Sequence, residues 1–309
     1  MRIFVAGATG VIGSRLVPLL LVEGHEVTAI GRSPAKREAL ARIGAAPMAV
    51  SLFEREALGR AVAGHQVVIN MATSIPSSSV RMLLRGAWKE TDRIRREGAA
   101  SLAHATRASG AERFIQESFA PIYADGGDRW IDESWPQEPV PYNRTILDAE
   151  RAAAEFSAAG GLGISLRFAG FYAADAFQVR DAIRMIRKGW APLPGSPTAF
   201  FSSIHHDDAA SAVIAALRAR AGAYNVTDDE PVSRREYVDL LAAAIGAPPP
   251  KLLPGWLVSL GGSIMELLTR SLRISNRKLW EETGWAPAFR SVREGWPAVV
   301  RSLDGALPS

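Results

Sequence analysis

The chain has 309 residues, of which 48% are hydrophobic and 22% are charged, an ordinary balance for a globular protein with a sizeable core. This composition excludes a disordered or fibrous protein. Because the chain contains no cysteine, it also excludes disulfides, thiolate catalysis and cysteine-ligated metal centres. The formal net charge is +4, and the basic residues are interleaved with acidic ones, which argues against nucleic acid as a partner.

No targeting or membrane segment is expected from the sequence. The first residues run directly into a strand and a turn, without the basic and long apolar regions of a signal peptide. The most apolar late window, residues 252–268, is interrupted by proline, glycine and glutamate, so we interpret it as a buried helix or a pocket wall. We therefore predict a cytoplasmic protein that binds no membrane and no nucleic acid, and a homodimer is left open.

Short apolar runs alternate with helix-like stretches through the first 170 residues, beginning with a strand at 3–6, a helix at 11–22, a strand at 26–30 and a helix at 35–43. Almost wholly apolar strands separated by helices predict an α/β fold, in which a doubly wound parallel sheet is covered on both faces. Such Rossmann-type sheets bind ligands at the carboxyl ends of their strands. The later predicted strands are Met48–Val50, Val67–Asn70, Phe114–Gln116 and Ile164–Phe168.

The pattern changes after about residue 170, where helical stretches dominate and the loops carry proline. We predict a sheet domain at 1–170 and a small, mostly helical C-terminal lobe at 171–309 that binds substrate. A strand at Tyr224–Val226 is expected to rejoin the sheet. Ser233 and Glu236 form a capping box that opens a helix ending near Ile245.

A glycine-rich turn follows the first strand and opens the first helix. Glycines at this place allow a tight turn and let backbone N–H groups approach a pyrophosphate, which then faces the positive end of the helix dipole. The position between strand and helix is the context that supports dinucleotide binding over a plain packing turn. The predicted cofactor-binding residues of this loop are Gly7, Thr9, Gly10, Val11, Ile12 and Gly13.

The end of the second strand predicts which dinucleotide is preferred. An enzyme that binds NAD usually places a carboxylate there for the ribose hydroxyls, whereas this chain has Arg32 and Ser33, with Lys36 one helical turn on. A guanidinium pairs with a 2′-phosphate through two charge-assisted hydrogen bonds. We therefore expect NADP(H) to be favoured over NAD(H).

These residues resemble the extended and atypical short-chain dehydrogenases/reductases, which include the NAD-dependent epimerases and dehydratases. The resemblance covers nearly the whole chain and implies a Rossmann core with an NAD(P) site to which Met71, Ala72 and Phe171 contribute. Phe171 is expected to flank the nicotinamide. The segments that carry it are Gly7–Gly13, Asn70–Ala72, Gly110–Ile115, Tyr142, Ser165–Phe168, Ser203–Ala210, Ala223–Val226 and Gly284–Pro287.

The catalytic positions of that family are changed in this chain. The family pairs a tyrosine with a lysine four residues later, but here Tyr142 is followed at that spacing by Ile146. The family's serine or threonine falls on Phe119, and its helix asparagine falls at about Arg95. The resemblance thus implies the atypical branch that lacks the Tyr-x-x-x-Lys pair.

Four residues are candidates for catalysis. Tyr142, without its lysine, is expected to keep a pKa close to about 10. Ser118 and Glu117 end the fifth strand at the expected substrate edge, and a buried Glu117 could act as a general base. Arg95 could orient an anionic substrate, or it could be a solvated residue of a charged helix.

No metal site is expected. Neighbouring residues on a strand point to opposite faces, so His205 and His206 cannot easily bind one ion together. The resemblance instead implies that Asp208 caps a helix and anchors the lobe.

We predict an NADP-binding oxidoreductase, akin to the epimerases and dehydratases, that acts on a small, fairly apolar organic substrate. Two alternatives remain open. One is a non-redox isomerase, cyclase or lyase that kept the scaffold without the hydride chemistry. The other is a regulatory protein that senses the dinucleotide and acts on a partner.

Overall fold

The computed structural model describes residues 1–76, 78–82, 84–253 and 262–304, and a parallel sheet of seven strands forms its centre. The strand order is β11-β7-β5-β4-β1-β2-β3, and each neighbouring pair is parallel, which confirms the predicted doubly wound sheet. The winding order reverses at β1, which lies between β2 and β4. The strands are β1 (Arg2–Ala6), β2 (Glu26–Ile30), β3 (Ala46–Met48), β4 (Val67–Asn70), β5 (Arg113–Phe119), β7 (Leu162–Phe168) and β11 (Gly222–Val226).

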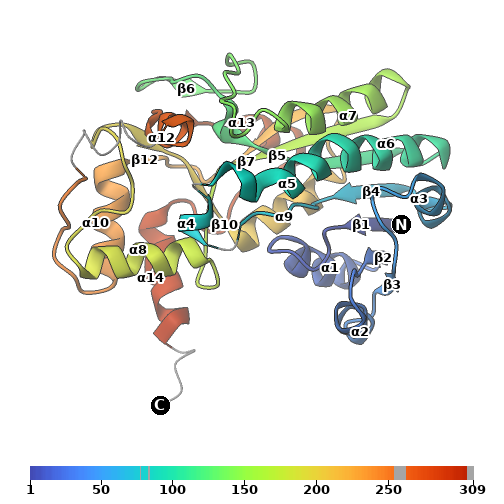
Figure 1. Ribbon diagram of the computed structural model, residues 1–309, viewed down its shortest axis with the longest axis horizontal. Helices are drawn as coiled ribbons and strands as arrows, with labels where there is room; N and C mark the ends of the chain where they lie inside the picture. Colours follow the sequence, from blue (N-terminus) through green and yellow to red (C-terminus); the bar gives the residue numbers. More distant parts are fainter. Residues whose placement is uncertain (77, 83, 254–261, 305–309) are drawn as a thin grey trace.

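Helices cover both faces of this sheet because each buries one apolar side against it. In Figure 1, α6 and α7 lie on one side of the strands and α1 and α2 on the other. Buried apolar side chains of α1, α2, α9 and α13 form one core, and those of α3, α6 and α7 form the second. These helices are α1 (Gly13–Val22), α2 (Pro34–Arg42), α3 (Arg55–Val62), α6 (Ala99–Ala108), α7 (Ile146–Ala158), α9 (His206–Ala216) and α13 (Arg277–Thr283).

A smaller lobe has its own core, in which Tyr172 and Trp296 are fully buried. It is formed mainly by α8 (Phe177–Arg187), α10 (Arg234–Ala244) and α14 (Val292–Asp304), which gather on the left of Figure 1. The Ser233 hydroxyl accepts a hydrogen bond from the Glu236 N–H over 3.2 Å, as the capping box predicts. Short two-stranded ladders join β6 (Trp130–Ile131) to β13 (Arg273–Ile274), β8 (Gly170–Tyr172) to β10 (Ser203–His205), and β9 (Phe200–Phe201) to β12 (Val232–Ser233).

The C-terminal part of the chain contributes to both units. As predicted, the strand at Tyr224–Val226 rejoins the sheet, because β11 pairs with β7. The helices α9 and α13 also pack on the sheet. The division into 1–170 and 171–309 therefore stays a prediction about domains, with β11, α9 and α13 belonging to the larger unit.

A run of short helical segments connects β4 to β5. It consists of α4 (Ser79–Met82), a 3₁₀ turn (Arg85–Trp88), α5 (Lys89–Arg93) and a π-helical turn (Ile94–Gly98) that continues into α6. π-helical turns inside helices are frequent at functional sites.

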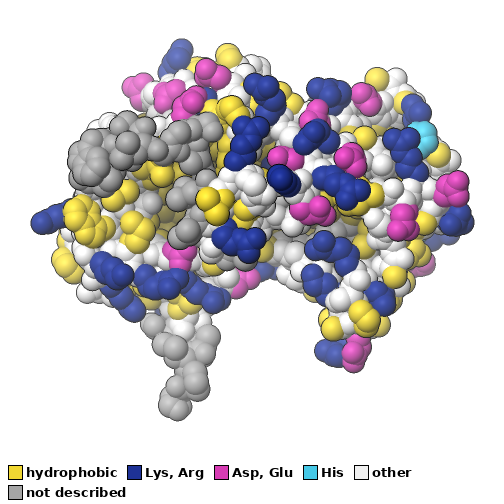
Figure 2. Space-filling model, in the orientation of Figure 1, with side chains coloured by type: hydrophobic (Ala, Val, Ile, Leu, Met, Phe, Trp, Pro, Cys, Tyr) yellow, Lys and Arg dark blue, Asp and Glu magenta, His cyan; other side chains and the backbone are white. Residues whose placement is uncertain are grey.

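The surface in Figure 2 carries lysine and arginine side chains with acidic ones among them. None of the helices in the described part of the chain is long and apolar enough to cross a membrane. Residues 254–261 of the apolar window at 252–268 lie outside the described residues. Its end forms the start of α12 (Gly262–Thr269).

Candidate active site

Two glycines of the first turn are required by the fold itself. Gly7 has φ of +80°, and a Cβ there would lie 2.4 Å from the carbonyl carbon of Met71. A Cβ on Gly13 would lie 2.1 Å from the Gly7 carbonyl oxygen. Both positions thus let the turn and α1 pack closely on the neighbouring backbone.

Gly10 differs from these two because it is exposed and has ordinary backbone angles. A Cβ on Gly10 would meet only the Gly7 carbonyl oxygen, at 3.2 Å. A side chain at this position therefore requires the Gly7 carbonyl to give way by a few tenths of an ångström, far less than at Gly7 or Gly13. Because Gly10 has no side chain, a ligand can come close to the backbone of the turn and to the start of α1.

A cavity of about 720 Å³ opens at the carboxyl ends of the central strands. Its lining includes every predicted cofactor-binding residue except Gly13 and Ser33. Gly13 packs beneath the turn, and Ser33 caps α2 by accepting a hydrogen bond from the Lys36 N–H over 3.3 Å. The predicted residues along the cavity are Gly7, Thr9, Gly10, Val11, Ile12, Arg32, Met71, Ala72 and Phe171.

The two ends of this cavity differ in character. Arg32 and Lys36 line the end beside β2, together with Glu54, an acidic residue that sequence reasoning missed. Glu117, near the carboxyl end of β5, lines the other end of the cavity. β5 and β2 lie on opposite sides of β1, where the strand order reverses. The cavity therefore spans β1 from a basic end to an end that carries a buried carboxylate. A glycine turn with a basic pocket on one side fits a dinucleotide that extends across the switch point.

Glu117 forms a buried ion pair with Arg95. The Arg95 Nη2 atom donates to Glu117 Oε1 over 3.2 Å, and the two residues are only 5% and 8% exposed. Arg95 is therefore not a solvated residue, because the π-helical turn directs it into the core. In the described part of the chain, neither Arg95 Nε nor Glu117 Oε2 has a hydrogen-bond partner. Glu117 lines the cavity, so its unpartnered oxygen can accept a hydrogen bond from a ligand there.

Ser118 faces away from this cavity because neighbouring residues of a strand point to opposite faces. Its hydroxyl donates to Glu150 Oε1 over 2.6 Å. Glu150 is in turn held by two hydrogen bonds of 2.7 Å from Arg167. The structure thus places Ser118 in a polar network of α7 and β7, apart from Glu117.

Tyr142 packs edge-on against Trp88, with the ring centroids 4.4 Å apart. Burial raises the pKa of Tyr142 well above its ordinary value, and the nearby Arg95 only partly opposes this effect. The expectation that this pKa stays near 10 is therefore wrong. Ile146, at the position of the family's lysine, is fully buried and supplies no charge. Tyr142 is thus a weaker acid than a free tyrosine.

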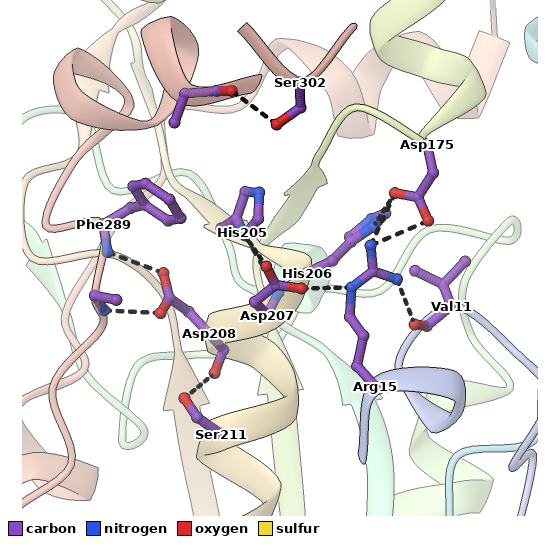
Figure 3. Close-up of polar contacts among 12 residues, drawn as sticks. Val11, Arg15, Asp175, His205, His206, Asp207, Asp208, Ser211, Phe289 and Ser302 are labelled. Carbon is purple, nitrogen blue, oxygen red and sulfur yellow. Dashed lines mark hydrogen bonds and ion pairs between the residues drawn. The ribbon is translucent and has the colours of Figure 1, made fainter. Parts of the chain in front are cut away.

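The two adjacent histidines have different partners (Figure 3). The prediction that both lie on one strand is wrong, because β10 ends at His205 and His206 begins α9. His205 caps α9 by accepting a hydrogen bond from the Asp207 N–H over 3.3 Å, so the predicted capping role of Asp208 is wrong. Asp208 is an anchor, because its carboxylate accepts from the N–H groups of Ala288 and Phe289 at 2.7 and 3.1 Å.

His206 lines the cavity and contacts Asp175, a pair that sequence reasoning missed. His206 Nδ1 lies 3.1 Å from Asp175 Oδ1. Arg15 of α1 contacts both oxygens of Asp175 at 3.1 Å, and it also donates to the carbonyl of Val11 in the glycine turn (Figure 3). The cluster ties the turn to the segment between β8 and α8. The only sequence signal was the doubled histidine.

This fold and cavity define the class to which the chain belongs. A model of the NAD dependent epimerase/dehydratase family matches residues 3–227, and the chain is a member of that family. It is an enzyme of the short-chain dehydrogenase/reductase type, as the sequence predicted.

Characterised relatives include several reductases. The chain is 35% identical to a "3-diazoavenalumate denitrifying reductase" from a Streptomyces species, over 96% of this chain and 99% of that protein. It is 28% identical to a "4-hydroxy-2-methyl-3-oxo-4-farnesyl-3,4-dihydroquinoline-1-oxide ketoreductase" from Stigmatella aurantiaca, over 80% of this chain and 74% of that protein.

Solved structures share the fold over almost the whole chain. A UDP-glucose 4-epimerase of Thermus thermophilus in complex with NAD superposes with a TM-score of 0.76 and 26% identity, covering 99% of this chain and all of that one. A human epimerase family protein with NADPH has the same TM-score at 20% identity, covering 98% of this chain and all of that one.

Proposed function

We propose that this enzyme is an NADP(H)-dependent reductase of a small, fairly apolar organic substrate. The observation that supports it most is the continuous cavity that joins Arg32 and Lys36 at one end to Glu117 and Phe171 at the other. When bound, the reduced nicotinamide would supply a hydride. The glycine turn and Arg32 would hold the dinucleotide, and Glu117, positioned by Arg95, would face the substrate.

Arg32 is expected to set the preference for the phosphorylated cofactor. Arg32→Ala should weaken NADPH binding by about ten- to a hundredfold, because a charge-assisted contact is worth about 1.5–3 kcal/mol. NADH binding should change little. Fluorescence titration of both cofactors measures this, with Arg42→Ala as the matched control, since Arg42 is exposed at the end of α2 and pairs with Glu38. Equal affinity of the unchanged protein for NADPH and NADH would contradict the preference.

The candidate catalytic residues and Ile146 favour substrates whose reduction needs little help from a protonated side chain. Tyr142 is a weak acid, Ile146 carries no charge, and Ser118 is engaged by Glu150. Among the four predicted catalytic residues, only Glu117 lines the cavity. A carboxylate paired with an arginine is an acceptor of hydrogen bonds and a partner for positive charge. We therefore place Glu117 as the group that faces the substrate and Arg95 as the residue that positions it.

An aromatic diazo compound is a second candidate substrate. It is favoured by the 35% identity to the denitrifying reductase over nearly the whole of both chains. Replacement of a diazonium group by hydrogen takes up one hydride, breaks the carbon–nitrogen bond and releases dinitrogen. Atoms and charge balance without a proton, so this reaction does not need the missing tyrosine–lysine pair.

A turnover assay with deuterated NADPH separates the candidates. Carbonyl compounds and an aryl diazonium acid are offered in parallel, and NADPH absorbance, product and released dinitrogen are followed together. We expect NADPH consumption to match product, with one deuterium in each product molecule. Product formed without NADPH consumption would contradict a reductase and favour the non-redox alternative.

A further inference from the structure

The Asp175–His206 pair is a built feature of the cavity that the reaction outlined above does not use. Asp175 precedes α8, and His206 begins α9, so two distant segments meet at this point. His206 is 2% exposed, yet it belongs to the cavity lining. Its ring meets the ring of Phe171 edge-on, with the centroids 5.5 Å apart.

The partners of Asp175 determine which nitrogen of His206 carries the proton. Partial burial would raise the pKa of the Asp175 carboxyl, but its contacts with His206 and Arg15 outweigh this effect and lower it. An ionised carboxylate can only accept hydrogen bonds, so His206 donates from Nδ1.

The second nitrogen of His206 is then an acceptor. Burial lowers the pKa of His206 to about 4, and the ring is therefore neutral near pH 7. A neutral imidazole with its proton on Nδ1 carries a lone pair on Nε2. The cavity wall beside Phe171 thus offers a hydrogen-bond acceptor on a ring that Asp175 and Arg15 hold in place.

The position of this acceptor indicates which part of a dinucleotide it faces. The basic residues Arg32 and Lys36 lie beside β2, so the adenosine half belongs to that end. Phe171 of β8 comes directly after β7, which lies on the other side of β1, and His206 at the start of α9 contacts Phe171. The nicotinamide half would lie there. Phosphate oxygens cannot donate to a lone pair, whereas the ribose hydroxyls and the carboxamide NH₂ group of the nicotinamide half can. The contact of His206 with Phe171, which is expected to flank the nicotinamide ring, favours the carboxamide.

We propose that His206 Nε2 accepts a hydrogen bond from the nicotinamide carboxamide and so positions the ring relative to Glu117. The inference rests on the dinucleotide binding in the proposed function. His206 acts here as a positioning residue, and Asp175 and Arg15 support it. Its role is specific to one group of the cofactor, which makes it testable by changing that group.

Binding titrations with two matched cofactors test this contact. The 3-acetylpyridine analogue of NADPH replaces the carboxamide NH₂ by a methyl group and so removes the donor. The unchanged protein should bind NADPH about three- to tenfold more tightly than the analogue, the range of one hydrogen bond. His206→Leu should abolish this ratio and leave the affinity for 2′,5′-ADP, which lacks the nicotinamide half, unchanged.

His205→Leu is the matched control, because His205 is a buried neighbour that packs on Tyr172 and Phe289 outside the cavity lining. It should keep the ratio. A ratio that persists in His206→Leu, or that is absent in the unchanged protein, would overturn the inference. If His206→Leu lost affinity for 2′,5′-ADP to the same extent as for NADPH, the substitution would disturb the whole site, and this result would also overturn the inference. Equal affinity for NADPH and NADH would contradict only the proposed NADP preference. The contact of His206 could then still be tested by comparing NADH with its own 3-acetylpyridine analogue.

Discussion

Gly10→Val is expected to abolish dinucleotide binding while the protein stays folded. The added side chain would occupy the mouth of the turn, where the backbone N–H groups and the start of α1 are open to an anion. Within the protein, a Cβ at this position meets only the Gly7 carbonyl oxygen, at 3.2 Å, so the structure needs to shift by only a few tenths of an ångström. We expect affinity for NADPH to fall by roughly a hundredfold or more, with a small change in Tm.

Two further variants show whether this effect is specific. Gly7→Val should unfold the protein, because its Cβ would lie 2.4 Å from the Met71 backbone at a φ of +80°. Gly59→Val introduces the same side chain into α3, where a Cβ meets nothing within 4 Å. It should leave binding unchanged. Binding of NADPH by folded Gly10→Val with unchanged affinity would show that the pyrophosphate does not approach this turn.

The fold could be predicted in outline because its signals are local. The apolar runs at 3–6, 26–30 and 67–70 coincide with buried strands, and the glycine turn connects the first of them to a helix. The third predicted strand, Met48–Val50, is instead β3 at Ala46–Met48, because its pairing with β2 fixes the register. Tertiary pairing, rather than the local pattern, sets such boundaries.

The candidate site could be predicted from the sequence only where its residues are neighbours in one short segment. The glycine turn and Arg32 are short motifs next to a strand end, and all of the predicted cofactor-binding residues except Gly13 and Ser33 line the cavity. The contacts of Glu117 with Arg95 and of His206 with Asp175 join segments 22 and 31 residues apart. Neither pairing leaves a periodic or spacing signal in the sequence. Ser118 shows the opposite error, since it follows Glu117 directly but points to Glu150.

Replacement of Glu117 is expected to have a large effect on turnover. Glu117→Gln should lower turnover by about a hundredfold or more, the range for removal of a preorganised electrostatic group that faces the reacting atoms. The glutamine oxygen can still accept from Arg95, so the variant removes the charge with little change of shape. Tyr142→Phe should lower turnover by less than about tenfold, because burial already makes Tyr142 a poor acid.

Ser118→Ala is the matched control for Glu117→Gln, since the two residues are neighbours on β5 but face different sides of it. It should reduce Tm through the loss of a buried hydrogen bond to Glu150 while kcat stays within severalfold. The measurement is turnover with saturating NADPH for variants whose Tm confirms folding. A large loss in Tyr142→Phe together with full activity in Glu117→Gln would mean that the old tyrosine still carries the reaction. In that case the rise that burial causes in the pKa of Tyr142 would have to be reversed in the bound complex, because a higher pKa makes a general acid less effective.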